Sequence, residues 1–147
     1  MAVLSWGKPT VEFKSSSASE WTAFPEIVED TAALETTEGE LIEATEEGGG
    51  VVDARRKRNK YKFSLELFVK KGDTRPITDD DGVIADNYSV RLTPEDEACE
   101  GFLLDKCNVT VSETWNAANG KRLRYTFDAI KPATGAICKP YTKGVSE

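Results

Sequence analysis

The chain has 147 residues, with a hydrophobic fraction of 39% and a charged fraction of 31%, which is typical of a single globular domain covering residues 1–147. Its 26 acidic residues outnumber its 19 basic ones, so the formal net charge is −7. This balance argues against a protein whose main task is to grip nucleic-acid phosphates. The sequence contains no histidine, which excludes Ser/His/Asp and Cys/His catalytic constellations.

The three cysteines, Cys99, Cys107 and Cys138, are odd in number and include no CxxC pair. We therefore expect three free thiols in a reducing compartment, no metal site and no cofactor. The N-terminus lacks a basic segment followed by a long apolar run, and no stretch approaches about 18 apolar residues. We accordingly expect no signal peptide, no membrane partner and assembly in the cytoplasm.

The first third of the chain predicts short strands separated by loops. Val11 and Phe13 alternate with polar neighbours, which is typical of a strand. Residues 14–20 are rich in serine and predict a loop. The apolar stretch 21–28 contains Pro25, so we expect an edge strand or an ordered loop that closes one end of the core.

Residues 35–60 form the most unusual stretch, because an acidic limb and a basic limb flank three glycines. Too few large apolar residues are present for a core strand, and like charges disfavour a helix. We interpret this stretch as a long, exposed, strand-like arm with a glycine hinge, and the open alternative is a mobile, solvated loop. The hinge residues are Gly48, Gly49 and Gly50. The residues predicted to contact neighbouring subunits are Glu38, Glu40, Glu43, Glu46, Glu47, Arg55, Arg56, Lys57 and Arg58.

The clearest strand follows directly, because its apolar residues alternate with polar ones from Tyr61 to Val69, with Phe68 as the exception. The inward-facing set is Tyr61, Phe63, Leu65, Leu67 and Val69. The acidic run 79–82 that comes later does not fit a calcium loop of the EF-hand type. Such a loop would begin at Ile77 and end at Tyr88, and neither residue supplies the required carboxylate.

The second half of the chain predicts a strand, one helix and a hairpin. Residues 83–92 alternate as a strand. Thr93 and Pro94, followed by three acidic residues, predict a helix of about two turns that Gly101 ends. Residues 108–115 and 121–130 predict a hairpin, since its connection ends in Asn-Gly.

The tail, residues 132–147, is expected to add at most one short strand near Ile137 and Tyr141. The sequence therefore predicts a mainly β protein. The expected architecture is an antiparallel β-sandwich or partly closed β-barrel of six or seven strands with one short flanking helix.

No catalytic motif emerges, so we expect the protein not to be an enzyme. The three tryptophans, Trp6, Trp21 and Trp115, leave open a non-catalytic β-sandwich binding module for a carbohydrate or a surface ligand. An accessory or regulatory protein of a mobile element is a further alternative.

The layout resembles the major tail tube proteins of long-tailed phages and prophages. The features that carry this resemblance are the start Leu4-Ser-Trp-Gly-Lys-Pro9, the patch Trp21 with Glu26-Ile-Val-Glu-Asp30, the arm Thr36–Gly49, the strand Asn59–Phe68 and the single helix before a closing hairpin.

The resemblance implies a virion structural protein that forms hexameric rings. The rings would stack into a tube that conducts DNA as passing cargo, and the subunit would contact itself and other tail proteins. The long loop, here residues 35–60, would join successive rings, and the protein would end in the virion tail.

Overall fold

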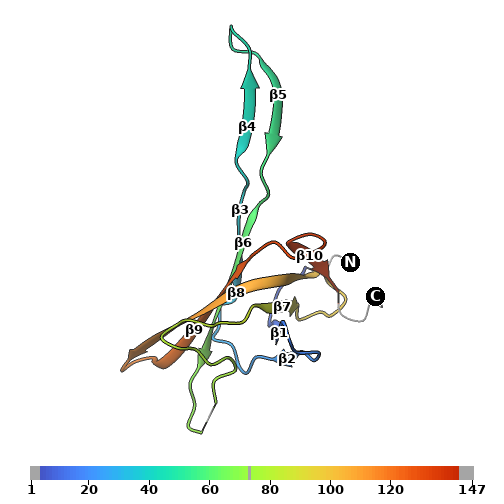
Figure 1. Ribbon diagram of the computed structural model, residues 1–147. Coiled ribbons are helices and arrows are strands. Elements are labelled where there is room, and N and C mark those ends of the chain that lie inside the picture. The colour runs from blue at the N-terminus through green and yellow to red at the C-terminus, as the bar shows by residue number, and fades with distance from the viewer. Residues whose placement is uncertain (1–3, 73, 143–147) are drawn as a thin grey trace.

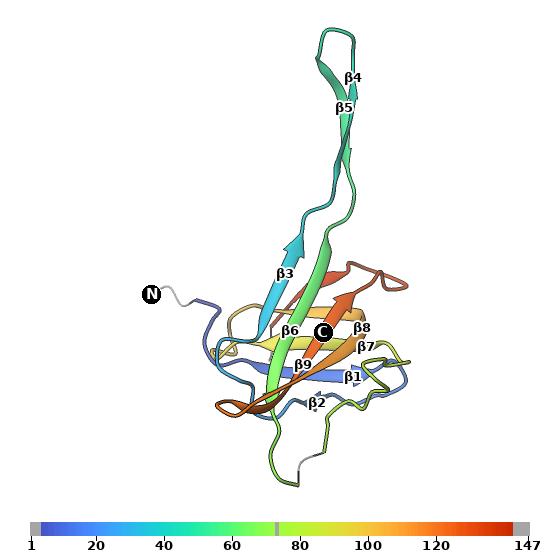
Figure 2. The same cartoon turned by 90° about the vertical axis from the view of Figure 1, so that its left-hand side faces the viewer.

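The computed structural model describes residues 4–72 and 74–142, which form ten antiparallel strands and, within these ranges, no helix (Figures 1 and 2). The strands are β1 (Thr10–Ser15), β2 (Thr22–Ala23), β3 (Ala33–Thr37), β4 (Leu41–Thr45), β5 (Val51–Arg56), β6 (Lys60–Phe68), β7 (Tyr88–Thr93), β8 (Gly101–Asn116), β9 (Gly120–Ala129) and β10 (Cys138–Tyr141). One sheet has the order β2-β1-β7-β8-β9-β6-β3, with β10 beside β8, and β4 and β5 form a second sheet alone. The prediction of a mainly β protein is therefore confirmed.

The large sheet curls around a single core. Phe24, which follows β2, packs against Tyr125 and Phe127 of β9, with ring centroids 5.7 and 6.0 Å apart, so the β2 edge lies across the core from β9. A single antiparallel bridge, Ile27 to Leu67, links the segment after β2 to β6. The edges of the sheet therefore approach each other without the continuous ladder that closes a barrel.

The strand with the clearest alternation, β6, lies one strand in from the β3 edge of the large sheet. β6 pairs with β9 on one side and β3 on the other. Its predicted inward residues Phe63, Leu65 and Leu67 are completely buried, as the alternation indicated. Tyr61 is half-buried, and Val69 lies exposed beyond the end of the strand.

The predicted helix at 93–101 is wrong, because this segment is the connection of a hairpin. β7 ends at Thr93, β8 begins at Gly101, and Leu92 pairs directly with Phe102. A two-turn helix would carry the chain about 12 Å from its start, whereas paired residues lie about 5 Å apart. An added Cβ at Gly101 would lie 1.9 Å from the Leu92 carbonyl oxygen, so this glycine permits a close strand approach.

The predicted hairpin at the end of the sheet is confirmed and is longer than expected. β8 spans 16 residues, and Asn116 pairs with Gly120, which takes a φ of 76° in the turn.

The tail contributes β10, beside the first residues of β8, while its residues 143–147 lie outside the described ranges. The predicted strand 83–92 begins only at Tyr88, because Val83 forms just an isolated bridge with Asp80. Residues 4–72 and 74–142 contain no helix, and so no helix long and apolar enough to cross a membrane.

Candidate assembly surface

The most conspicuous surface feature is a two-stranded hairpin, β4–β5, that projects from the body (Figures 1 and 2). β3 and β6 pair side by side in the body. Between them the chain runs outward as β4 and returns as β5, and these two strands pair with each other. Every residue of β5 is exposed, and in β4 only Ile42 is partly covered. In this hairpin the acidic and basic limbs are antiparallel partners within one chain.

The hairpin leaves the body through a narrow neck, which we define as residues 38–40 and 55–58. The Gly39 N–H donates to Asn59 Oδ1 at 3.0 Å, and the Lys57 N–H donates to the Glu40 carbonyl at 3.0 Å. A Cβ at Gly39 would lie 1.8 Å from the Lys57 carbonyl oxygen. The outgoing and returning segments therefore approach too closely at the neck for any residue but glycine. No sequence pattern indicates this role, because it depends on which residues lie opposite Gly39.

The glycines predicted to form a hinge lie at the far end of the hairpin. Gly48 and Gly49 have φ values of 102° and 98°, and the Gly49 N–H donates to the Glu46 carbonyl at 3.0 Å. The Glu46 N–H in turn donates to the Gly50 carbonyl at 2.8 Å. These residues turn the chain back on itself, and their role as a hinge stays a prediction.

Basic and acidic residues occupy different parts of the hairpin. The neck is net basic and carries Glu38, Glu40, Arg55, Arg56, Lys57 and Arg58. The tip, which we define as residues 43–53, has no basic residue and carries Glu43, Glu46, Glu47 and Asp53. Val51 and Val52 are 52% and 69% exposed, so the tip is both acidic and apolar. In the neck, Lys57 and Glu40 form an exposed ion pair at 3.7 Å.

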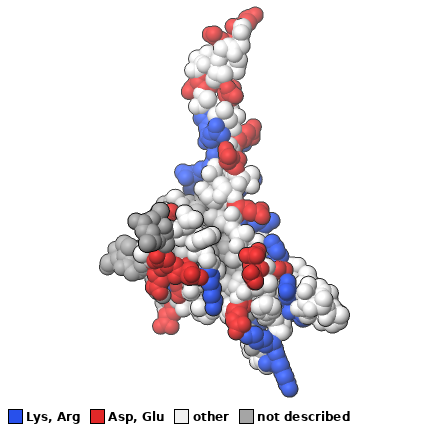
Figure 3. All heavy atoms as spheres, turned by 180° about the vertical axis from the view of Figure 1, so that it is seen from behind, with Lys and Arg blue, Asp and Glu red and all other residues white. Residues whose placement is uncertain are grey.

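The end of the body opposite the hairpin carries a group of basic residues, several of which form ion pairs with acidic neighbours. β6 runs from the neck to Phe68, so the loop that follows β6 lies at the far end of the molecule (Figure 1). Figure 3 shows acidic side chains at the hairpin tip and basic side chains at this opposite end. The described basic residues of the β6–β7 loop and of the start of β9 are Lys70, Lys71, Arg75, Lys121 and Arg122.

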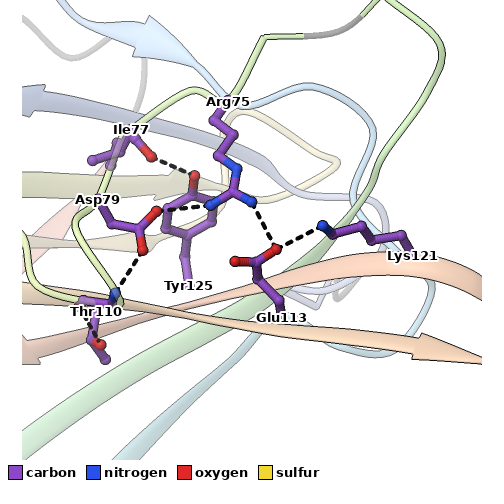
Figure 4. A network of polar contacts seen from close by, with 8 residues as sticks. Arg75, Ile77, Asp79, Thr110, Glu113, Lys121 and Tyr125 are labelled. Atoms are coloured by element: carbon purple, nitrogen blue, oxygen red, sulfur yellow. Dashed lines mark hydrogen bonds and ion pairs between the residues drawn. The ribbon is translucent and has the colours of Figure 1, made fainter.

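A polar network fixes the β6–β7 loop onto β8 and β9 (Figure 4). Arg75 contacts Asp79 at 2.8 Å and Glu113 at 2.7 Å, and Lys121 contacts the same Glu113 oxygen at 2.7 Å. The hydrogen bond from Lys121, followed by that from Arg75, lowers the pKa of the Glu113 carboxyl group. The buried Tyr125 hydroxyl donates to the Ile77 carbonyl at 2.7 Å and holds the inner side of the loop. This end of the body is consequently an ordered surface.

The three tryptophans do not form one stacking platform. The Trp6 carbonyl accepts a hydrogen bond from the Glu95 N–H, near the start of β8, whereas Trp115 lies at the other end of β8. The Arg91 guanidinium covers the Trp21 ring, with its Cζ 4.3 Å from the ring centroid.

Within the described ranges there is also no group of three or more cysteine or carboxylate side chains arranged to hold a metal ion.

The sequence matches no family model and no curated protein. The structure is similar to a chain in the cryo-EM structure of an extracellular contractile injection system, described as the PVC sheath/tube terminator in the extended state. The TM-score is 0.53 at 11% identity, and the alignment covers 82% of this chain and 89% of that one. The chain thus shares its fold with a component of an extracellular contractile injection system.

Proposed function

We propose that this protein is a non-catalytic structural subunit of a phage-tail-type tube. Copies associate into hexameric rings, the rings stack, and DNA passes through the tube without specific binding. Two observations support this proposal: the resemblance of the sequence layout to tail tube proteins, and the fold shared with a component of an injection system. The curled sheet serves as the sandwich-like wall of the ring, and the net charge of −7 keeps DNA from adhering to it.

The projecting hairpin is the observation that carries the proposal. An isolated two-stranded hairpin is at best marginally stable in water, and no strand among residues 4–72 and 74–142 other than β4 and β5 belongs to this sheet. It also presents both of its faces and its apolar tip to solvent. Contact with neighbouring subunits would cover these groups, which explains why the chain maintains such an element. The charged residues of neck and tip are the proposed subunit contacts.

Sedimentation velocity over a wide concentration range tests this function. A matched control replaces residues 40–57 with Asn-Gly, which suits a tight turn between β3 and β6. We expect the full-length protein to form large species as its concentration rises, and the shortened protein to stop at small species. A full-length protein that remains monomeric at every concentration would contradict the proposal.

A further inference from the structure

A hollow lies between the N-terminal segment and the connection from β2 to β3. It measures about 880 Å³, and two continuous stretches, residues 5–11 and 24–30, supply most of its lining. Ile27, whose bridge to Leu67 links the approaching edges of the curled sheet, is one of the lining residues. The hollow therefore lies where the sheet stays open, and we call it the seam groove.

The floor of the seam groove is apolar, and a tryptophan lies exposed beside it. Val11, Phe24 and Val28 line the groove and are buried. Trp6, which also belongs to the lining, is 70% exposed. The Trp6 backbone is held in place, because its carbonyl accepts a hydrogen bond from the Glu95 N–H at 3.3 Å. A large aromatic side chain on an anchored backbone, next to an apolar hollow, is typical of a residue that anchors a binding partner.

Carboxylate groups flank this apolar floor. Glu29 and Asp30 line the groove, both are exposed, and neither forms an ion pair within residues 4–72 and 74–142. The lining also contains Lys8, and Glu26, which pairs with Lys70 at 2.7 Å. The connection from β7 to β8 lies beside the groove and adds four acidic residues and no basic one: Glu95, Asp96, Glu97 and Glu100. This surplus of negative charge favours a positively charged occupant.

The hollow beside the β6–β7 loop has no such surplus. It measures about 400 Å³, and its charged lining residues are Arg75 and Lys121. Both of them pair with Glu113, so their charges are balanced within the chain. This difference selects the seam groove as the site for a charged partner.

We propose that the seam groove binds an extended, apolar and positively charged segment of a different protein. A stretch of seven residues spans at most about 23 Å, and two such stretches line the groove, so an elongated occupant covers more of it than a compact one. Apolar side chains of the segment cover Trp6 and the floor, while its lysine or arginine side chains meet Glu29 and Asp30. A second copy of this chain is the less favoured occupant, because it carries the same net charge of −7. This binding does not require assembly into a tube.

A random library of short peptides tests the preference of the groove. The library is selected on the immobilised protein at low concentration, and the affinities of the enriched peptides are measured by fluorescence anisotropy. We expect the enriched peptides to combine apolar residues with an excess of lysine and arginine over acidic residues. An enriched set without this excess, or no enrichment at all, would overturn the proposal.

Two variants locate the binding. Trp6→Ala removes the exposed aromatic ring, and Glu29→Gln with Asp30→Asn removes the carboxylates. Each should weaken binding of the enriched peptides about tenfold or more. Asparagine is accepted at position 30, where φ is 60°, so the double variant keeps the shape of the groove.

Matched controls make the same changes elsewhere on the surface. Trp115→Ala alters a tryptophan that is 71% exposed at the other end of β8. Glu46→Gln with Glu47→Gln removes two exposed carboxylates from the hairpin tip. Both controls should bind the enriched peptides as the unaltered protein does, and controls that lose affinity equally would overturn the proposal.

Sedimentation velocity with the enriched peptides present separates a foreign partner from a second copy. We expect the peptides to leave the association of the protein with itself unchanged. Peptides that break up the assemblies would assign the groove to a second copy and overturn the proposal. A protein that remains monomeric but binds the peptides would contradict the tube and leave this proposal intact.

Discussion

Individual side chains at the edge of the core hold the β6–β7 loop, at the end of the body opposite the hairpin, in place. Tyr125 is completely buried, yet its hydroxyl reaches the Ile77 carbonyl in the β6–β7 loop. Tyr125 alternates with Arg124 and Thr126 along the strand, but no sequence pattern indicates the carbonyl that its hydroxyl meets. The hydrogen bond joins the core of β9 to the loop that carries Arg75, so it contributes both to stability and to the order of this loop.

Replacing Tyr125 with phenylalanine should destabilise the fold by about 1–2 kcal/mol, because the buried Ile77 carbonyl loses its donor. Urea unfolding monitored by tryptophan fluorescence measures the free energy of unfolding. Tyr61→Phe is the matched control, since Tyr61 is only partly buried and its hydroxyl lies 3.5 Å from Asn59 Nδ2. Equal stability of the two variants would show that the Tyr125 hydrogen bond contributes little.

Cys107 should be the least reactive thiol of the chain. It is completely buried in β8, and this burial, with Asp128 and Asp105 adding to it, raises its pKa to about 12. At pH 8 its reactive thiolate is therefore scarce, whereas Cys99 and Cys138 are only half-buried. Alkylation with iodoacetamide, followed by peptide mass spectrometry, should modify Cys107 last. Labelling of Cys107 at the rate of Cys138 would contradict this.

Strands were easier to predict than their connections. Residues 61–67 and 121–129 alternate between apolar and polar side chains, and both segments lie in core strands. Residues 93–101 carry every local signal of a helix start, but the pairing of Leu92 with Phe102 overrides these signals. The sequence also did not predict that residues 35–60 form one hairpin. Strand register is read from a hydrophobic pattern, and two charged, exposed strands have no such pattern.

The hairpin should be dispensable for folding. The buried core cluster has no member between residues 38 and 60, so replacing residues 40–57 with Asn-Gly removes no core residue. We expect the free energy of unfolding to change by less than about 1 kcal/mol, since shortening an exposed loop alters stability little. Urea unfolding of the shortened protein checks this, and a loss of cooperative unfolding would show that β4–β5 stabilises the body.

Across the whole molecule, charge is arranged along one axis. The tip is acidic, the neck is net basic, and the far end of the body carries basic residues, several of which form ion pairs with acidic neighbours. The sequence displayed the acidic and basic runs of the arm, but it gave no indication that Lys71 and Arg75 would lie at the opposite end from the tip. That placement comes from the direction of β6, which only the folded sheet fixes.

Assembly should therefore weaken as salt is added. Raising the ionic strength from 0.1 to 1 M shortens the screening length from about 10 Å to about 3 Å, which removes most of the attraction between exposed charges. Light scattering at a fixed protein concentration should fall across this range. Scattering that stays constant or rises would indicate that apolar contacts dominate the interface.

The central claim is that this chain builds a tube from copies of itself. Negative-stain electron microscopy of the purified, concentrated protein in low salt tests it most directly. The account predicts rings and stacked tubes of uniform diameter. A field of separate particles, each the size of one chain, would contradict it.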